Sequence, residues 1–127
     1  MLVKLCLLVV AVIHLLPLAG LFGVERLRDL YGITLDSPSA ILLMQHRAVL
    51  FGLLGGVLLL AIAWPVIRPV ALAAAWVSVV SFIVLAFLGG PVNEQVQRVL
   101  YADYVALVCL VVIAIHGFVA SRGEVLT

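Results

Sequence analysis

Residues 38–64, PSAILLMQHRAVLFGLLGGVLLLAIAW, decide the fold of this chain, because they form an apolar run long enough to cross a bilayer. The run also begins like a helix, since Ser37 is a preferred capping residue and Pro38 suits the first helical position. His46 and Arg47 nevertheless lie inside it. An arginine in hydrocarbon costs about 2.5 kcal/mol or more, so we expect Arg47 to have a partner or a purpose.

Three further runs of the same kind, residues 2–22, 70–88 and 94–121, fill most of the remaining chain. With 67% hydrophobic and 10% charged residues, the chain lies outside the composition range of soluble domains. The sequence therefore predicts an all-α fold: a polytopic four-helix bundle in a membrane, with residues 1–127 as a single transmembrane domain. An even number of spans places both termini on the same side of the membrane.

Residues 24–31, between the first two spans, predict a short amphipathic helix. One face of this helix is apolar and the other is charged. The apolar residues are Val24, Leu27, Leu30 and Tyr31, and the charged residues are Glu25, Arg26, Arg28 and Asp29. Such a helix suits the boundary between lipid and water, so we expect it to lie in the membrane interface.

The charged residues give little information about partners or orientation. The net charge is +1 and the chain has no basic run, so we expect no nucleic-acid partner. Lysines and arginines divide almost equally between the two sides of the predicted bundle, and only Lys4 with the N-terminal amine favours termini in the cytoplasm. We call the opposite side, which carries residues 23–37 and 89–93, the loop side.

Arg47 and Asp103 are predicted to lie at matching depth. Arg47 follows Pro38 by nine residues, Asp103 follows Glu94 by nine, and both helices begin on the loop side. At a rise of 1.5 Å per residue, both side chains start about 13 Å below the first turn of their helix. If the two helices are neighbours, we expect an ion pair between the guanidinium and the carboxylate.

Other polar residues fall in the same half of the bundle. His14 and Ser81 lie deeper, and Pro17 leaves the carbonyl of Ile13 without its usual donor, which predicts a kink near His14. The candidate catalytic residues are Asp103, His46 and Arg47, and the candidate ligand-binding residues are His14, Gln45, Ser81, Tyr101 and Tyr104. Because residues 45, 46 and 47 point about 100° apart on a helix, they cannot all face one interior.

Two interpretations of these residues remain open. A few converging polar groups within apolar walls suit a lipophilic small molecule, such as a quinone, an isoprenoid or a sterol-like lipid. Asp103 would then move a proton while Arg47 or His46 polarises a carbonyl or hydroxyl. In the other interpretation the same residues are structural contacts between helices, and the protein is a non-catalytic interaction or assembly subunit of a larger membrane complex.

No metal site and no cofactor are predicted. Haem held by two histidines would need His14 and His46 to face each other at equal depth, whereas His14 lies deeper. Cys6 and Cys109 are far apart in the sequence and form no CxxC motif, so we interpret them as packing residues. A transport pathway would need several copies of so short a bundle.

The arrangement of a His in the first span, Gln45-His46-Arg47 in the second and a lone Asp103 in the fourth resembles small bacterial four-helix membrane proteins of the DoxX-like type. The most distinctive local piece is the run His46-Arg47-Ala48-Val49-Leu50-Phe51-Gly52. Members of that broader group are similar to quinone-linked oxidoreductase subunits or to assembly helpers. The resemblance implies a multi-pass protein of the bacterial inner (cytoplasmic) membrane with an accessory role.

Small residues recur where helices have to approach closely. Gly52 and Gly56 form a GxxxG spacing, and Ala71, Ala74 and Ser78 follow one another along the third span. Such spacing either packs the bundle itself or joins two copies of the chain, so a homo-oligomer through Gly52 and Gly56 is one expected partner. The other expected partner is a membrane lipid or lipophilic small molecule.

Overall fold

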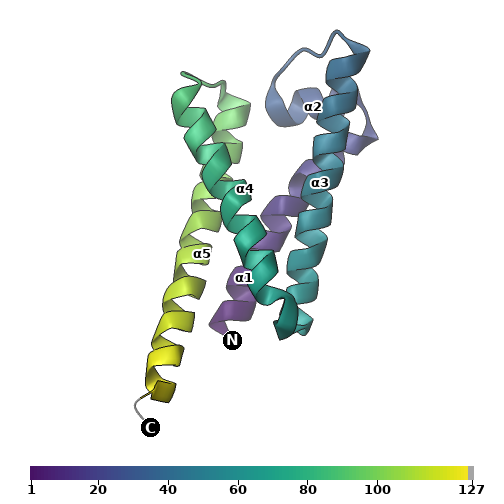
Figure 1. Cartoon of the computed structure of the whole chain (residues 1–127). Helices are drawn as coiled ribbons and strands as arrows, with labels where there is room; N and C mark the ends of the chain where they lie inside the picture. Colours follow the sequence, from purple (N-terminus) through teal and green to yellow (C-terminus); the bar gives the residue numbers. More distant parts are fainter. Residues whose placement is uncertain (126–127) are drawn as a thin grey trace.

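Each apolar run forms a long helix in the computed structural model, which describes residues 1–125 (Figure 1). Four helical segments are long and apolar enough to cross a membrane, in agreement with the predicted bundle. The elements are α1 (Leu2–Leu15) with the 3-10 segment η1 (Leu16–Phe22), α2 (Val24–Tyr31), α3 (Pro38–Ala63), the 3-10 turn η2 (Pro65–Ile67), α4 (Arg68–Leu88) and α5 (Glu94–Val125).

The helix ends follow the local sequence. Ser37 Oγ accepts the backbone N–H of Ala40 at 3.1 Å, so the predicted cap is confirmed, and Asn93 Oδ1 caps α5 in the same way by accepting the N–H of Val96 at 2.8 Å. The kink predicted at Pro17 takes the form of a change from α-helix to 3-10 helix just before the proline. The third span begins earlier than predicted, because Pro69 fits within the first turn of α4.

The four long helices form a ring in which α3 and α5 are not neighbours. Both α1 and α4 pack against α3, and both also pack against α5. Helices α3 and α5 therefore lie on one diagonal of the bundle, and α1 and α4 lie on the other. This order decides which polar groups can meet across the interior.

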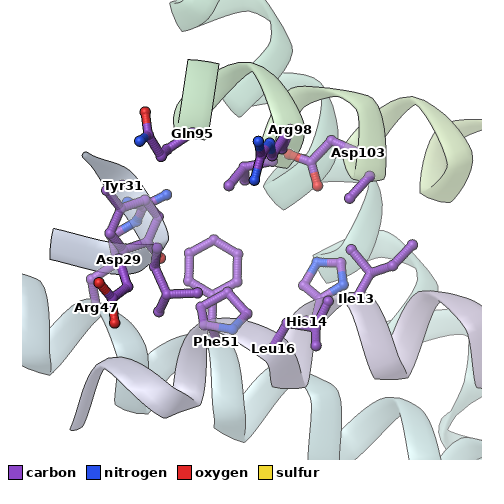
Figure 2. Close-up of a pocket in the computed structure, with 14 residues that line it drawn as sticks. Ile13, His14, Leu16, Asp29, Tyr31, Arg47, Phe51, Gln95, Arg98 and Asp103 are labelled. Atoms are coloured by element: carbon purple, nitrogen blue, oxygen red, sulfur yellow. The ribbon is translucent and has the colours of Figure 1, made fainter. Parts of the chain in front are cut away.

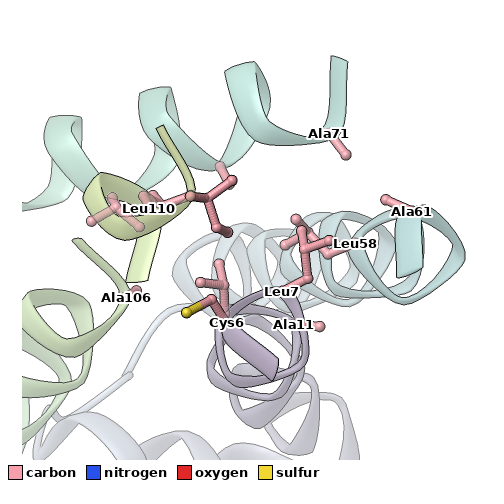
Figure 3. Close-up of a cluster of buried hydrophobic side chains, with 12 residues drawn as sticks. Cys6, Leu7, Ala11, Leu58, Ala61, Ala71, Ala106 and Leu110 are labelled. Atoms are coloured by element: carbon pink, nitrogen blue, oxygen red, sulfur yellow. The ribbon is translucent and has the colours of Figure 1, made fainter. Parts of the chain in front are cut away.

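The half of the bundle nearest the termini is tightly packed (Figure 3). Its buried cluster contains many alanines, which allow the helices to approach closely. The buried members are Cys6, Leu7, Val10, Ala11, Leu58, Ala61, Ala71, Ala75, Val79, Ala106, Leu110 and Ile113. On α4 the buried small residues are Ala71 and Ala75, whereas Ala74, which the sequence pattern had placed in the same row, is exposed.

Two further contacts strengthen this terminal half. The Arg68 side chain donates to the carbonyls of Ala61 and Ile62, at 2.8 and 3.2 Å, and so satisfies the last turn of α3 from the start of α4. Cys109 on α5 lies against Cys6 on α1 within the same cluster, although the two cysteines are far apart in sequence. Both thiols are free.

Toward the loop side the bundle divides, because α4 leans away from α3 (Figure 1), whereas α2 stays in contact with α5. Helix α2 covers this end, with Leu27 and Tyr31 buried and its charged face exposed, as its amphipathic pattern predicts. Asn93 ties α2 to the start of α5, because its Nδ2 donates to the carbonyl of Tyr31 at 2.9 Å. The division of the bundle on the loop side is where α1, α2, α3 and α5 line a space.

The glycines of α3 are used in different ways. A Cβ on Gly52 would lie 2.5 Å from Leu18 Cδ1, and a Cβ on Gly55 would lie 2.7 Å from Leu15 Cγ and 3.1 Å from the carbonyl oxygen of Ala11. Both glycines therefore let α3 approach the first span of the same chain. A Cβ on Gly56 would meet nothing within 4 Å. Of the predicted GxxxG pair, only Gly56 is left free for another copy.

Candidate functional site

A cavity of about 290 Å³ lies where the bundle divides, enclosed by α1, η1, α2, α3 and α5 (Figure 2). Its polar and aromatic lining residues are His14, Asp29, Tyr31, Arg47, Phe51, Gln95, Arg98 and Asp103. Apolar side chains complete the wall: Ile13, Leu16, Pro17, Leu30, Val99 and Ala102. The cavity thus brings together three predicted site residues: His14, Arg47 and Asp103.

Hydrogen bonds at both ring nitrogens hold His14 in one orientation. Its Nδ1 donates to the carbonyl of Val10 at 2.8 Å, which leaves Nε2 to accept the hydroxyl of Ser78 at 3.3 Å. The ring also stacks on Phe51, with centroids 5.8 Å apart. Because His14 is 1% exposed and fully engaged, it serves as a fixed wall of the cavity.

The Arg47 guanidinium lies among three aromatic rings from three different helices. Its central carbon is 5.2 Å from the ring centre of Tyr31 on α2, 5.1 Å from that of Phe51 on α3, and 5.6 Å from that of Phe82 on α4. Ring faces attract a cation, with about 0.5–2 kcal/mol for each well-placed pair. The rings therefore offset part of the cost of holding this charge in the bundle.

The ion pair expected between Arg47 and Asp103 does not form. Among the side chains that the structure describes, the one ion pair joins Glu25 and Arg28, on the exposed face of α2. The physical reason is the helix order, because α3 and α5 lie on a diagonal and the cavity separates them. Asp103 is 7% exposed and faces this cavity from the α5 side (Figure 2).

The mouth of the cavity is charged. Asp29 on α2 lies at this end of the cavity, with Gln95 and Arg98 from the first two turns of α5. These residues belong to the helix ends on the loop side, where a membrane protein meets water. Arg98 and Asp103 lie on the α5 side of the cavity, opposite His14 and Phe51 (Figure 2). The polar end of the cavity therefore faces the loop-side interface.

A second space, which we call the groove, lies between α3 and α4 and measures about 540 Å³. Arg47 and Phe51 line both the groove and the cavity, so these two side chains lie between the two spaces. The remaining groove residues are Ser78, Ser81, Phe82, Leu85, Ala86, Val92 and Val96. Its outer edge is apolar and open, since the Leu85 side chain is 66% exposed.

Five predicted site residues lie outside the cavity. His46 is exposed and points away, because it is 100° around the helix from Arg47. Gln45 is half-buried elsewhere on α3. Tyr101 is 58% exposed and packs against Tyr104, with ring centres 6.4 Å apart. Ser81 lines the groove and donates to the carbonyl of Ser78 at 3.1 Å. The placement of His46 also removes the facing histidine pair that haem would need.

Several residues of the site were not predicted from the sequence. Phe51 stands one turn after Arg47, a spacing that places the two side chains on one helix face and could have identified it. Tyr31 was assigned to the apolar face of the interfacial helix, without a partner. Phe82 and Ser78 were missed as site residues because nothing in the sequence shows that α4 turns those positions toward α3 and α1.

No family model matches this chain, and no curated protein or solved structure matches it either. The DoxX-like resemblance therefore stays a prediction, and the function has to be inferred from the geometry of the site.

Proposed function

We propose that this chain is a multi-pass protein of the bacterial inner membrane, with cytoplasmic termini, that binds a lipophilic small molecule with a polar head. The expected ligand classes are quinones, isoprenoids and sterol-like lipids. One observation carries the proposal: Arg47 and Asp103 line one cavity from opposite helices, without pairing to each other. A DoxX-like character would fit such an accessory role.

The cost of charge in a membrane supports a ligand at this place. A bilayer-buried arginine or aspartate is expensive, and direct pairing would be the simplest compensation. The chain instead keeps the two groups on either side of a space. That space is near the lower end of small-molecule pockets, about 300 Å³, and has the usual lining of apolar walls with a few polar groups. A ligand head with an acceptor oxygen toward Arg47 and a hydroxyl toward Asp103 would compensate both groups.

The arrangement also supports proton transfer, although not by the predicted set of residues. A ligand hydroxyl that faces Asp103 can give its proton to the carboxylate, while Arg47 stabilises negative charge on a ligand oxygen. His46 has no part in this chemistry because it lies outside the cavity. His14 forms part of the wall, and its ring is held by Val10 and Ser78.

Co-purification tests the proposal directly. Wild type, Asp103→Asn and the matched control Asp36→Asn, an exposed acid outside the cavity, are purified gently and analysed by mass spectrometry and visible spectroscopy. We expect one stoichiometric lipophile in wild type and Asp36→Asn, and its loss in Asp103→Asn. Bulk phospholipid alone in all three samples would refute a ligand site.

The second candidate function is a non-catalytic interaction subunit. The open surface at Gly56, where an added Cβ meets nothing, favours it. In that case Gly56→Leu would release a partner chain or a second copy from the purified protein, whereas Asp103→Asn would not.

A further inference from the structure

We propose that the ligand reaches the cavity sideways from the bilayer and consists of a compact head on one flexible apolar chain. The head occupies the cavity and accepts an N–H from Arg47, and the chain lies in the groove between α3 and α4. This inference rests on the proposed function, because it requires an occupied cavity. It narrows the ligand to a head-and-chain amphiphile and excludes a rigid fused-ring sterol.

The two spaces differ in what surrounds them. The cavity has Asp29, Gln95 and Arg98 toward the interface and Asp103 deeper inside. The outer part of the groove is formed by apolar side chains, Leu85 and Val92 among them, and both of these are exposed. A molecule that fills both spaces therefore needs a polar end and an apolar end, and its apolar end must reach the lipid.

Arg47 stands at the junction of the two spaces. The rings of Tyr31, Phe51 and Phe82 offset its charge, but ring faces supply no oxygen acceptor. The guanidinium has five N–H donors and no carboxylate partner among the described side chains. A carbonyl, carboxylate or phosphate oxygen of a passing head would complete its hydrogen bonding, so the acceptor oxygen is the chemistry that the site recognises.

The arrangement of Arg47 and Phe51 between the two spaces favours a flexible ligand. The cavity and the groove share Arg47 and Phe51, so a ligand that fills both spaces has to bend around these side chains. A single chain can bend around a side chain, whereas a fused ring system cannot.

Photolabelling of the protein in nanodiscs tests the route. Two probes carry a diazirine near the end of the chain: a sixteen-carbon fatty acid and a decyl benzoquinone. Ala86→Trp fills the groove, and Ala74→Trp, on the exposed surface of the same helix, is its matched control. We expect one or both probes to label residues 79–96 in wild type and Ala74→Trp, with roughly tenfold less labelling in Ala86→Trp.

Arg47→Gln tests the head. Losing a hydrogen bond from a charged donor costs about 1.5–3 kcal/mol, so the retained probe should bind at least about tenfold more weakly. Retention of the fatty acid would identify an acidic head, and retention of the quinone would identify a carbonyl head. Circular dichroism verifies folding, and Val92→Trp at the groove edge replaces Ala86→Trp if that variant fails to fold.

Two outcomes would overturn the inference in distinguishable ways. If a ligand is lost in Asp103→Asn but binds normally to Ala86→Trp and Arg47→Gln, the cavity is a site and the lateral route is wrong. If wild type retains no probe and no native lipophile, the proposed function fails and this inference fails with it.

Discussion

His14 Nε2 and Ser78 Oγ lie 3.3 Å apart and join α1 to α4, the two helices on the diagonal that the cavity does not separate. The bond fixes the His14 ring, which lines the cavity, through Ser78, which lines the groove.

A double-mutant cycle measures its strength. We expect His14→Ala and Ser78→Ala to show a coupling of about 0.6 kcal/mol in the free energy of unfolding in mixed micelles, the average for hydrogen bonds between membrane helices. Ser81→Ala is the control, because Ser81 bonds within its own helix, and it should show no coupling to His14. Strict additivity of His14→Ala and Ser78→Ala would contradict the geometry.

The adjacent glycines of α3 give a second prediction. Gly55→Ala should lower the free energy of unfolding by about 1–3 kcal/mol relative to Gly56→Ala, because only Gly55 lies against Leu15 and the Ala11 backbone. Both changes gain the same helix propensity, so their difference reports packing alone. Thermal unfolding of the two variants side by side provides the measurement. Equal stability would mean that α3 does not approach α1 as closely as described.

Asn93 both caps α5 and links it to α2, and different substitutions separate these two roles. Asn93→Asp keeps the oxygen that caps α5 and loses the donor to Tyr31, whereas Asn93→Ala loses both. We expect Asn93→Asp to cost about 0.5–1.5 kcal/mol of unfolding free energy, and Asn93→Ala to cost about 1 kcal/mol more. Ser37→Ala, which removes a cap alone, serves as the reference. No loss of stability in Asn93→Asp would remove the role of the link to α2, and identical losses for both Asn93 variants would remove the role of the cap.

Tyr31 predicts a pH dependence. Burial raises the pKa of its phenol above the ordinary value of 10.0, and the neighbouring Arg47 charge opposes that rise only in part. Since the unfolded chain loses this proton at lower pH than the folded chain, ionisation favours unfolding. The stability that the neutral, buried phenol contributes is complete below pH 10 and is lost as the pH rises through the pKa of Tyr31 in the folded chain.

The measurement compares wild type with Tyr31→Phe between pH 8 and 11. As the pH rises, wild type should lose unfolding free energy relative to Tyr31→Phe. Absorbance titration should also lose the raised-pKa phenol in Tyr31→Phe. A pH-independent difference would show that the Tyr31 phenol is not buried in the folded chain.

The fold could be predicted from the sequence because each element has a local cause. The lengths of the apolar runs determine the four spans. Ser37 and Asn93 determine where two helices start, and Pro17 determines where α1 changes to 3-10 helix. The order of helices around the ring has no such local cause. The order depends on which helix faces lined with small residues pack together. Ala74 is exposed and its neighbour Ala75 is buried, so a shift of one position changes which face of α4 is packed.

The candidate site was predictable only in part for the same reason. Depth along a helix follows from counting residues, and this placed Arg47 and Asp103 at one level. Direction around the helix and neighbourhood do not follow from counting. His46 therefore points outward, and Arg47 meets the rings of Phe51 and Phe82 in place of a carboxylate.

The Arg68 contacts to the last carbonyls of α3 have a consequence for motion. They tie the end of α3 to the start of α4 at the end of the bundle opposite the cavity. We therefore expect a ligand to enter by separation of the loop-side ends of these two helices, while their terminal ends stay joined.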